Sequence, residues 1–262
     1  MRVVYNRLPS YFHFKNFLIK MFFFKKSGVF SFAEFNVLVK YNYDEFKGFA
    51  SDYASDEKPD FKISINGRDI RYEKAVAVEA KDAPDWYHET TAVARKFCIK
   101  AAEYGVILFH CSAIAVDGQA YLFAAPSGTG KSTHARLWRE MLGGRTEMVN
   151  DDKPFVRFKD GVPYVYGSPW NGKHRLSSNI SRPIKGICFL EQGAENNIKR
   201  IAPREALPRL CRQIFYSRNE KNFGEVMNVA GKLCSSVPLY VMQCNISREA
   251  AEMSYKTMSE GE

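Results

Sequence analysis

The fold of this chain is decided by the stretch Ala125-Pro-Ser-Gly-Thr-Gly-Lys131-Ser132. It follows an apolar run, residues 120–124, that predicts a buried strand. It precedes residues 133–142, in which apolar side chains recur at helical spacing. Because a strand, a glycine-bearing loop and a helix form the setting that cradles phosphate groups, the stretch predicts a phosphate-binding loop of the Walker A kind. The alternative is a chance turn of glycine and serine before a helix.

The residues of this loop have distinct expected roles. Gly128 and Gly130 let the backbone turn tightly, so that its N–H groups can meet phosphate oxygens, and the helix N-terminus adds about half a positive charge. Lys131 can reach the β- and γ-phosphates, and the Ser132 hydroxyl can ligate Mg²⁺. Ala125 replaces the usual first glycine, which is tolerable if its φ stays negative. The predicted nucleotide-binding residues here are Ser127, Gly128, Thr129, Gly130, Lys131, Ser132 and Thr133.

A pair of acids follows the next expected strand. Met148 and Val149 lead into Asn150, Asp151 and Asp152. One of the two carboxylates would hold Mg²⁺ against the triphosphate, together with Ser132, and the other would take the proton from an attacking hydroxyl. Neighbouring carboxylates also raise the pKa of one of them, which suits a base at neutral pH. The alternative is an Asx-rich turn after a strand.

A later loop, residues 167–175, is rich in basic side chains. Lys173, His174 and Arg175 follow one another at its end. Arginine in such a loop can clamp phosphate oxygens, so Arg175 is a further predicted nucleotide contact, or the loop can hold the acceptor. An ordinary surface loop is the alternative interpretation.

Composition sets the classes of partner. A chain of 262 residues can form one large domain or two small ones, and its formal charge of +9 suits anionic ligands such as nucleoside triphosphates or acidic peptides. Nucleic acid would rest on that charge alone and is not the expected partner. The six cysteines lack C-x-x-C spacing, which favours free thiols in a cytoplasmic setting. The apolar run at residues 17–24 is too short to span a membrane.

The elements expected before the loop divide the chain into two parts. Residues 1–80 are expected to form a β-rich N-terminal layer, and residues 81–262 the catalytic domain. Evidence for the layer is alternation at Phe12–Phe14, Phe30–Phe32, Phe35–Val39 and Val76–Ala80, with a hairpin turn at Asn66-Gly67. A helix is expected over 85–104 with a stop at Gly105, and a hairpin over 114–124.

The elements expected after the acid pair serve as scaffold. They are a hairpin around Asp160-Gly161, a strand at 184–190, helices at 203–219 and 226–234, a strand at 237–244 and a last helix capped by Ser247. None of these segments carries a side chain to which the sequence assigns chemistry.

The stretch from His110 to Asp152 resembles the HPr serine kinase and phosphoenolpyruvate carboxykinase superfamily. The resemblance rests on His110 ahead of the loop, on the loop itself and on the pair Asp151-Asp152. The stretches Gly167-Ser-Pro-Trp170 and Phe189-Leu190-Glu191 are similar to small bacterial HPr-kinase-like proteins, some of them linked to peptide-modification clusters. About half of the chain takes part in the resemblance, and residues 1–80 contribute little.

The resemblance implies an α/β P-loop core of the HPr kinase and carboxykinase type, and a kinase that uses Mg²⁺ and ATP. It implies that His110 lies beside the γ-phosphate and the metal, with Lys131 on the phosphates and Asp151 and Asp152 serving metal and acceptor hydroxyl. The expected acceptor is serine of a protein or peptide. A small metabolite such as free serine, or a nucleotide-binding regulatory module without turnover, are the alternatives, and a homo-oligomer is compatible with all of them.

Two departures from the family pattern narrow the activity. Thr133 stands where HPr kinases carry an acidic residue after the loop lysine and serine, which argues against HPr as the substrate and against a reverse phosphorylase reaction. Carboxykinases are about twice as long, and their oxaloacetate-binding arginines have no counterpart in this sequence. Carboxykinase chemistry is therefore not expected.

Overall fold

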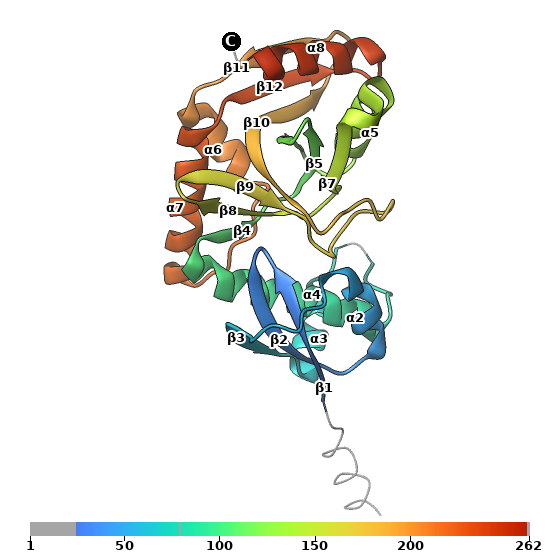
Figure 1. Ribbon diagram of the computed structural model, residues 1–262, viewed down its shortest axis with the longest axis vertical. Helices are drawn as coiled ribbons and strands as arrows, with labels where there is room; N and C mark the ends of the chain where they lie inside the picture. The colour runs from blue at the N-terminus through green and yellow to red at the C-terminus, as the bar shows by residue number, and fades with distance from the viewer. Residues whose placement is uncertain (1–24, 79, 261–262) are drawn as a thin grey trace, which may run out of the picture.

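The protein has a mixed α/β fold in two connected parts (Figure 1). The computed structural model describes residues 25–78 and 80–260. The N-terminal part contains β1 (Lys26–Phe32), β2 (Phe35–Tyr41), α2 (Asp44–Phe49), β3 (Phe61–Ser64), α3 (Gly67–Val76) and α4 (Asp85–Ala101). The larger part contains β4 (Val106–Leu108), β5 (Cys111–Val116), β6 (Gln119–Ala124), α5 (Lys131–Leu142), β7 (Thr146–Asn150), β8 (Phe155–Lys159), β9 (Val162–Tyr166), β10 (Ser181–Gln192), β11 (Asn197–Arg200), α6 (Pro203–Cys211), α7 (Glu220–Ser236), β12 (Leu239–Cys244) and α8 (Arg248–Glu260).

The large sheet curls around its longest strand, β10. Its strand order is β4-β8-β9-β10-β6-β5-β7, with β12 on β10 and β11 on β12. Successive parts of β10 pair with β9, β6 and β12, and its pairing with β6 and β12 is parallel. The expected hairpins β5–β6 and β8–β9 are both present. The strand that leads into the glycine loop, β6, is therefore held in the middle of the sheet.

Helices cover both faces of this sheet (Figure 1). Side chains of a strand alternate between faces, so Tyr121 and Phe123 of β6 both point to one face. There they pack with Trp138 of α5 in a cluster that also includes residues of α8. Leu122 faces the other way and packs in the cluster that contains Leu233 of α7. With two buried faces, β6 reads as a continuous apolar run, which is why the sequence predicted it.

The N-terminal part is a three-stranded sheet, β1-β2-β3, with α2, α3 and α4 around it. The strands predicted around Phe30 and Phe35 are confirmed, as is the helix that begins at Asp85. It ends at Ala101 and continues as a 3-10 turn, Ala102–Tyr104, which Gly105 stops with a φ of 75°. Phe30 and Phe32 stack in register on one face of β1 and lie in the same apolar cluster as Phe97 of α4. The N-terminal sheet and α4 thus share one aromatic core.

Three expectations for residues 1–80 need correction or lie outside the structure. Asn66 does not start a hairpin turn: its side chain accepts hydrogen bonds from the backbone of Arg68 and Asp69 and begins α3 with a capping box. The described residues of the stretch 76–80 form no strand: Val76 ends α3, Val78 is 97% exposed, and Ala80 has a φ of 56°. The pair Phe12–Phe14 lies outside the described residues.

The helix expected over 203–219 is shorter than the sequence indicated. It ends at Cys211, and the main chain of Ile214 then bridges to Phe109 in extended form. Pro208 inside the helix removes one backbone donor, and pairing with the β4–β5 connection supplies a competing use for the backbone that follows. The other expected elements of this region are confirmed as β10, α7, β12 and α8.

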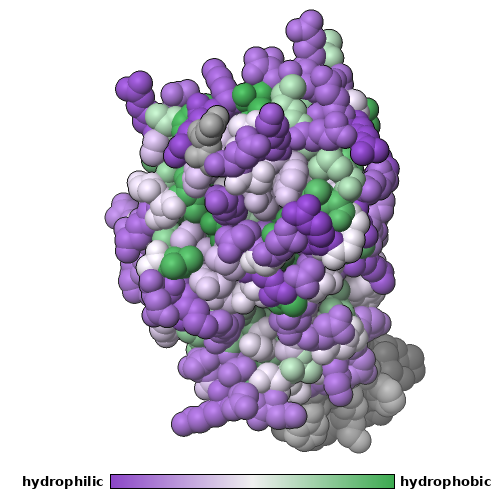
Figure 2. All heavy atoms as spheres, turned by 45° about the horizontal axis from the view of Figure 1, so that its top comes forward, coloured by the Kyte–Doolittle hydropathy of each residue, from purple (hydrophilic) through white to green (hydrophobic). Residues whose placement is uncertain are grey.

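Most of the surface seen in Figure 2 is hydrophilic, with small groups of apolar residues between the hydrophilic ones. Within residues 25–78 and 80–260, no helix has the length and apolar character needed to cross a membrane.

The last helix is joined to the helix after the glycine loop by one buried serine. The Ser254 hydroxyl lies 2.8 Å from His134 Nε2 and accepts a hydrogen bond of 2.9 Å from the Trp138 indole. The same hydroxyl donates to the carbonyl oxygen of Ala250, so the proton of this contact belongs to His134 Nε2. Burial lowers the pKa of His134 to about 4, which keeps its ring neutral in the folded protein.

Stability should fall as the pH drops from about 7 to about 5. The unfolded chain binds a proton at His134 near its ordinary pKa of about 6.5, whereas the fold resists protonation until about pH 4, so acid favours unfolding. The expected loss from this one group is about 2 kcal/mol over that range. Urea unfolding at both pH values measures it, with His134→Gln as the comparison. An equal loss in the His134→Gln variant would assign the effect to other groups.

Candidate active site

The predicted strand, loop and helix are present as β6, residues 125–130 and α5. Gly128 and Gly130 adopt φ values of 80° and 118°, in the left-handed region that favours glycine. Lys131 opens α5, is only 8% exposed and donates a hydrogen bond of 2.8 Å to the carbonyl oxygen of Ala125. The lysine therefore folds back over its own loop, with its amine shielded from water.

Asp151 lies buried at the end of β7. Its side chain is among the least exposed of the charged groups, with 3% of its residue surface accessible. Oδ1 accepts a hydrogen bond of 2.9 Å from the Ser112 hydroxyl on β5. Oδ2 is buried and has no hydrogen-bond partner within residues 25–78 and 80–260. A buried carboxylate oxygen without a donor is costly, which is typical of a group that meets a ligand.

Asp152 is paired with His110. His110 Nε2 lies 3.3 Å from Asp152 Oδ1, and Lys153 forms an ion pair with the same carboxylate. Burial alone would raise the pKa of Asp152, but the hydrogen bond from His110 and the charge of Lys153 outweigh it and hold the pKa at about 2. Asp152 is therefore not the member of the acid pair with a raised pKa, because cationic and donor groups surround it.

Electrostatics connect the acid pair with the loop lysine. Burial lowers the pKa of Lys131, and the nearby charges of Asp152 and Asp151 act in the opposite direction. Lys131, His110 and the adjacent Asp151 and Asp152 thus come from three segments, with the lysine near enough to both carboxylates for their charges to act on it and His110 in contact with Asp152.

Asn150 shapes the turn that carries both acids. Its Oδ1 accepts backbone N–H groups of Asp152 and Lys153 at 2.8 and 2.7 Å. Its Nδ2 donates to the carbonyl oxygen of Ser168 at 2.9 Å, which ties the turn to the loop that follows β9. This is an Asx turn with a second anchor, and it fixes the direction of the acid pair.

The residues predicted as metal ligands, Ser132, Asp151 and Asp152, suit a Mg²⁺ ion whose remaining ligands are phosphate and water oxygens. Ser132 is the second residue of α5, and Asp151 and Asp152 directly follow β7. Among the described residues, no group of three or more His, Cys, Asp or Glu side chains could hold a metal ion. Mg²⁺ is usually bound by one or two carboxylates plus phosphates and water, so a donor set of this kind fits it.

Two cavities are lined in part by α5. One of about 300 Å³ is lined by the glycine loop, by the first turns of α5 and by the ends of β10 and β12. Its walls include Thr129, Thr133 and His134, with Gln192 and Ile246 opposite. The cavity begins where the loop ends, so a group attached to a bound phosphate can extend into it.

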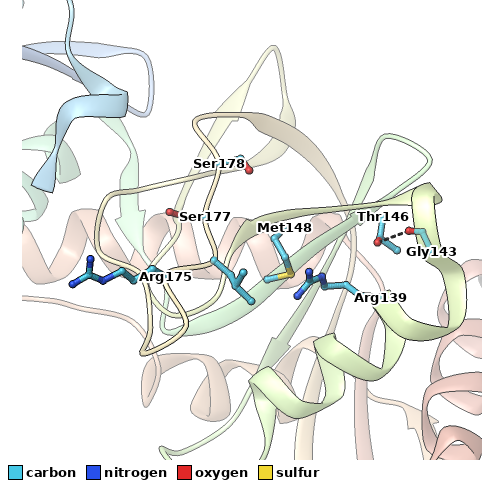
Figure 3. Close-up of a pocket in the computed structure, with 8 residues that line it drawn as sticks. Arg139, Gly143, Thr146, Met148, Arg175, Ser177 and Ser178 are labelled. Carbon is cyan, nitrogen blue, oxygen red and sulfur yellow. Dashed lines mark hydrogen bonds between the residues drawn. The ribbon is translucent and has the colours of Figure 1, made fainter. Parts of the chain in front are cut away.

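The second cavity, of about 370 Å³, lies between α5, β7 and the loop after β9 (Figure 3). Arg175 lines this cavity and is not a wall residue of the one beside the glycine loop. In Figure 3, Arg139 points toward Met148, whereas the guanidinium of Arg175 points away from Arg139. Arg175, predicted from the sequence to be a nucleotide contact, therefore does not line the cavity beside the other predicted nucleotide-binding residues.

Comparisons with known proteins give little guidance. No family model matches the chain, and no curated protein sequence matches it. Among solved structures, the HPr(Ser) kinase/phosphatase from Coxiella burnetii is similar with a TM-score of 0.36 and 9% identity, over 58% of this chain and 88% of that chain. A similarity of this size indicates a distant relationship only.

The structure adds polar residues that the sequence did not single out. Ser112 binds Asp151, Asn150 builds the acid turn, and Gln213 contacts His110. Ser112 lies two residues after His110, and Asn150 directly precedes Asp151, so their places in the sequence could have suggested a role in the site. Gln213 follows a helix far along the chain, and no local pattern marks it.

Proposed function

We propose that this protein is a Mg²⁺-ATP-dependent kinase that transfers the γ-phosphate to a hydroxyl, with serine of a protein or peptide as the acceptor. The observation that carries the proposal is Asp151 Oδ2, a buried carboxylate oxygen with no partner among the described residues, close to a lysine that opens a helix after a glycine loop. Transfer of a phosphoryl group depends mainly on positioning and on neutralising charge.

ATP would occupy the loop and the cavity next to it. The N–H groups around Gly128 and Gly130 and the N-terminus of α5 would hold the phosphates, and Lys131 would leave the carbonyl of Ala125 to bind the β- and γ-phosphates. The adenine ring of ATP would enter the cavity of about 300 Å³, where Leu137 and Ile246 offer apolar surface and Gln192 offers an amide.

The two aspartates would have different tasks. Asp152, with its pKa held at about 2, stays ionised and suits the metal, which Ser132 would share. Asp151 Oδ2 would accept the proton of the acceptor hydroxyl while the oxygen of that hydroxyl attacks the γ-phosphorus. The bond between that phosphorus and the β–γ bridging oxygen breaks, and ADP leaves. Bound Mg²⁺ would neutralise charge on the phosphates, and His110 would lie beside it.

Mass spectrometry of candidate acceptors tests the proposal. Serine-containing peptides and, separately, free serine are incubated with the protein, Mg²⁺ and ATP, and each product is examined for one added phosphoryl group. Phosphoserine in a peptide is the expected result, and phosphorylation of free serine alone would move the proposal to a metabolite kinase. ATP binding without any phosphorylated product would favour a regulatory nucleotide-binding module.

Binding of nucleotide should also stabilise the fold. Mg²⁺-ATP at about 100 times its Kd should raise the free energy of unfolding by about 2.7 kcal/mol, because it binds the native chain and not the unfolded one. Thermal unfolding with and without Mg²⁺-ATP measures the effect, and ATP with a chelator serves as the control for the metal. An unchanged midpoint at high Mg²⁺-ATP would contradict every nucleotide-based function for this site.

A further inference from the structure

We infer that Gln213 is a positioning residue that holds the imidazole of His110 against Asp152. The inference rests on the proposed function, in which His110 and Asp152 lie at the transferred phosphate. It assigns a role in the site to the segment after α6, which the sequence indicated to be scaffold only.

The side-chain contacts place Gln213 on the far side of the imidazole from Asp152. Gln213 Oε1 lies 3.0 Å from His110 Nδ1, and Asp152 Oδ1 lies 3.3 Å from His110 Nε2. Gln213 is 9% exposed, so water does not readily replace its amide. Each ring nitrogen therefore has one fixed polar partner, and rotation of the ring about its Cβ–Cγ bond would break both contacts.

Backbone pairing holds the same residues in place. The N–H of His110 donates to the carbonyl oxygen of Gln213 at 2.7 Å, and the next contacts along the two segments are the Phe109–Ile214 bridge and Phe215 N–H to Leu108 O at 3.1 Å. The segment 213–215 thus runs antiparallel beside 108–110.

The opposite side of this connection is also paired. The N–H of Phe109 donates to the carbonyl oxygen of Pro154 at 3.0 Å, and the N–H of Cys111 donates to that of Asp152 at 3.2 Å. His110 therefore lies in the connection between β4 and β5, hydrogen-bonded on one side to the acid turn and on the other to the segment after α6. With the backbone of His110 held on both sides, its imidazole can still rotate about the side-chain bonds. The contact with the amide of Gln213 restricts that rotation.

An amide is well suited to this task. The side chain of glutamine carries an acceptor oxygen and a donor nitrogen, and a half-turn of the amide exchanges them without moving the rest of the residue. Gln213 can therefore bond Nδ1 whether that nitrogen carries a hydrogen or a lone pair. Leucine at this position would keep the approximate size and the backbone pairing but would offer no polar partner.

A double-mutant cycle tests the inference. Gln213→Leu should lower kcat about tenfold, the lower end of what loss of an outer-sphere partner costs, while KM for ATP stays unchanged. In a His110→Ala background the same substitution should cause no further loss, because Gln213 acts through His110. The matched control is Gln119→Leu, at an exposed position at the start of β6, which should leave kcat unchanged. Wild-type kcat in Gln213→Leu, or an equal loss in the His110→Ala background, overturns the inference.

A second readout does not depend on kinase activity, so failure of the proposed function and failure of this inference can be told apart. Ring-nitrogen NMR of His110, assigned with His110→Gln, should give distinct signals for Nδ1 and Nε2 in the wild-type protein. In Gln213→Leu these signals should shift and broaden, because the ring loses a fixed partner. An unchanged His110 spectrum in Gln213→Leu contradicts the positioning role even if no phosphate acceptor is found.

Discussion

Replacing Asp151 with asparagine should lower kcat for phosphate transfer by about 10³-fold. The amide keeps the shape of the carboxylate and still offers Ser112 an acceptor, but it cannot take up the proton of an attacking hydroxyl. Steady-state kinetics with an identified acceptor measures the loss. KM for ATP should change little, because the proton acceptor does not hold the nucleotide.

The comparison for this variant is Asp160→Asn, in the turn between β8 and β9. Asp160 is exposed and has a φ of 50°, a conformation that asparagine adopts readily. It should match the wild-type protein in kcat and in thermal unfolding. If Asp151→Asn turned over at the wild-type rate, Asp151 could not be the base, and the orphan oxygen would need another explanation.

Lys131→Met should lower kcat about 10²- to 10³-fold, the usual cost of removing one donor from a developing negative charge. It should also weaken Mg²⁺-ATP binding, because the loop loses its cation. Stability should not fall with activity: burial already lowers the pKa of Lys131, so the amine is held in the fold at a cost that methionine avoids. Steady-state kinetics measures the loss of kcat, and urea unfolding measures whether stability is retained.

Lys159→Met is the matched control for the loop lysine. Lys159 is exposed at the end of β8 and pairs with Glu34, so its loss should leave kcat unchanged and stability within about 1 kcal/mol. A Lys131→Met protein that bound Mg²⁺-ATP and transferred phosphate as well as the Lys159→Met protein would contradict the assignment of the loop.

Local chemistry explains what the sequence could predict. The order of β6, loop and α5 follows from a buried apolar run, two glycines and helical spacing, all within about one supersecondary unit. The turn at Asp160-Gly161 and the stop at Gly105 likewise depend on residues that adopt positive φ. In each case the residues that form the element also carry the signal for it.

Contacts between residues far apart in the chain explain the features that the sequence could not predict. Asn66-Gly67 has the composition of a hairpin turn, yet the next segment packs on α4 as a helix, and Asn66 serves as its cap. The residues after Cys211 have helical spacing but pair with the β4–β5 connection about one hundred positions earlier. The contact of Gln213 with His110 arises from that pairing and has no counterpart in either local sequence.

Trp170 makes the two parts of the chain dependent on each other. Its indole N–H donates to the carbonyl oxygen of Thr90 at 2.9 Å, and its ring lies against Phe32, Phe49 and Phe155. Only Phe155 among these neighbours belongs to the larger part, so a gene rearrangement that deleted the N-terminal part would expose a large aromatic side chain beside the acid turn. The two parts are therefore poor candidates for exchange as independent modules during evolution, and any descendant without the first would need a smaller residue in place of Trp170.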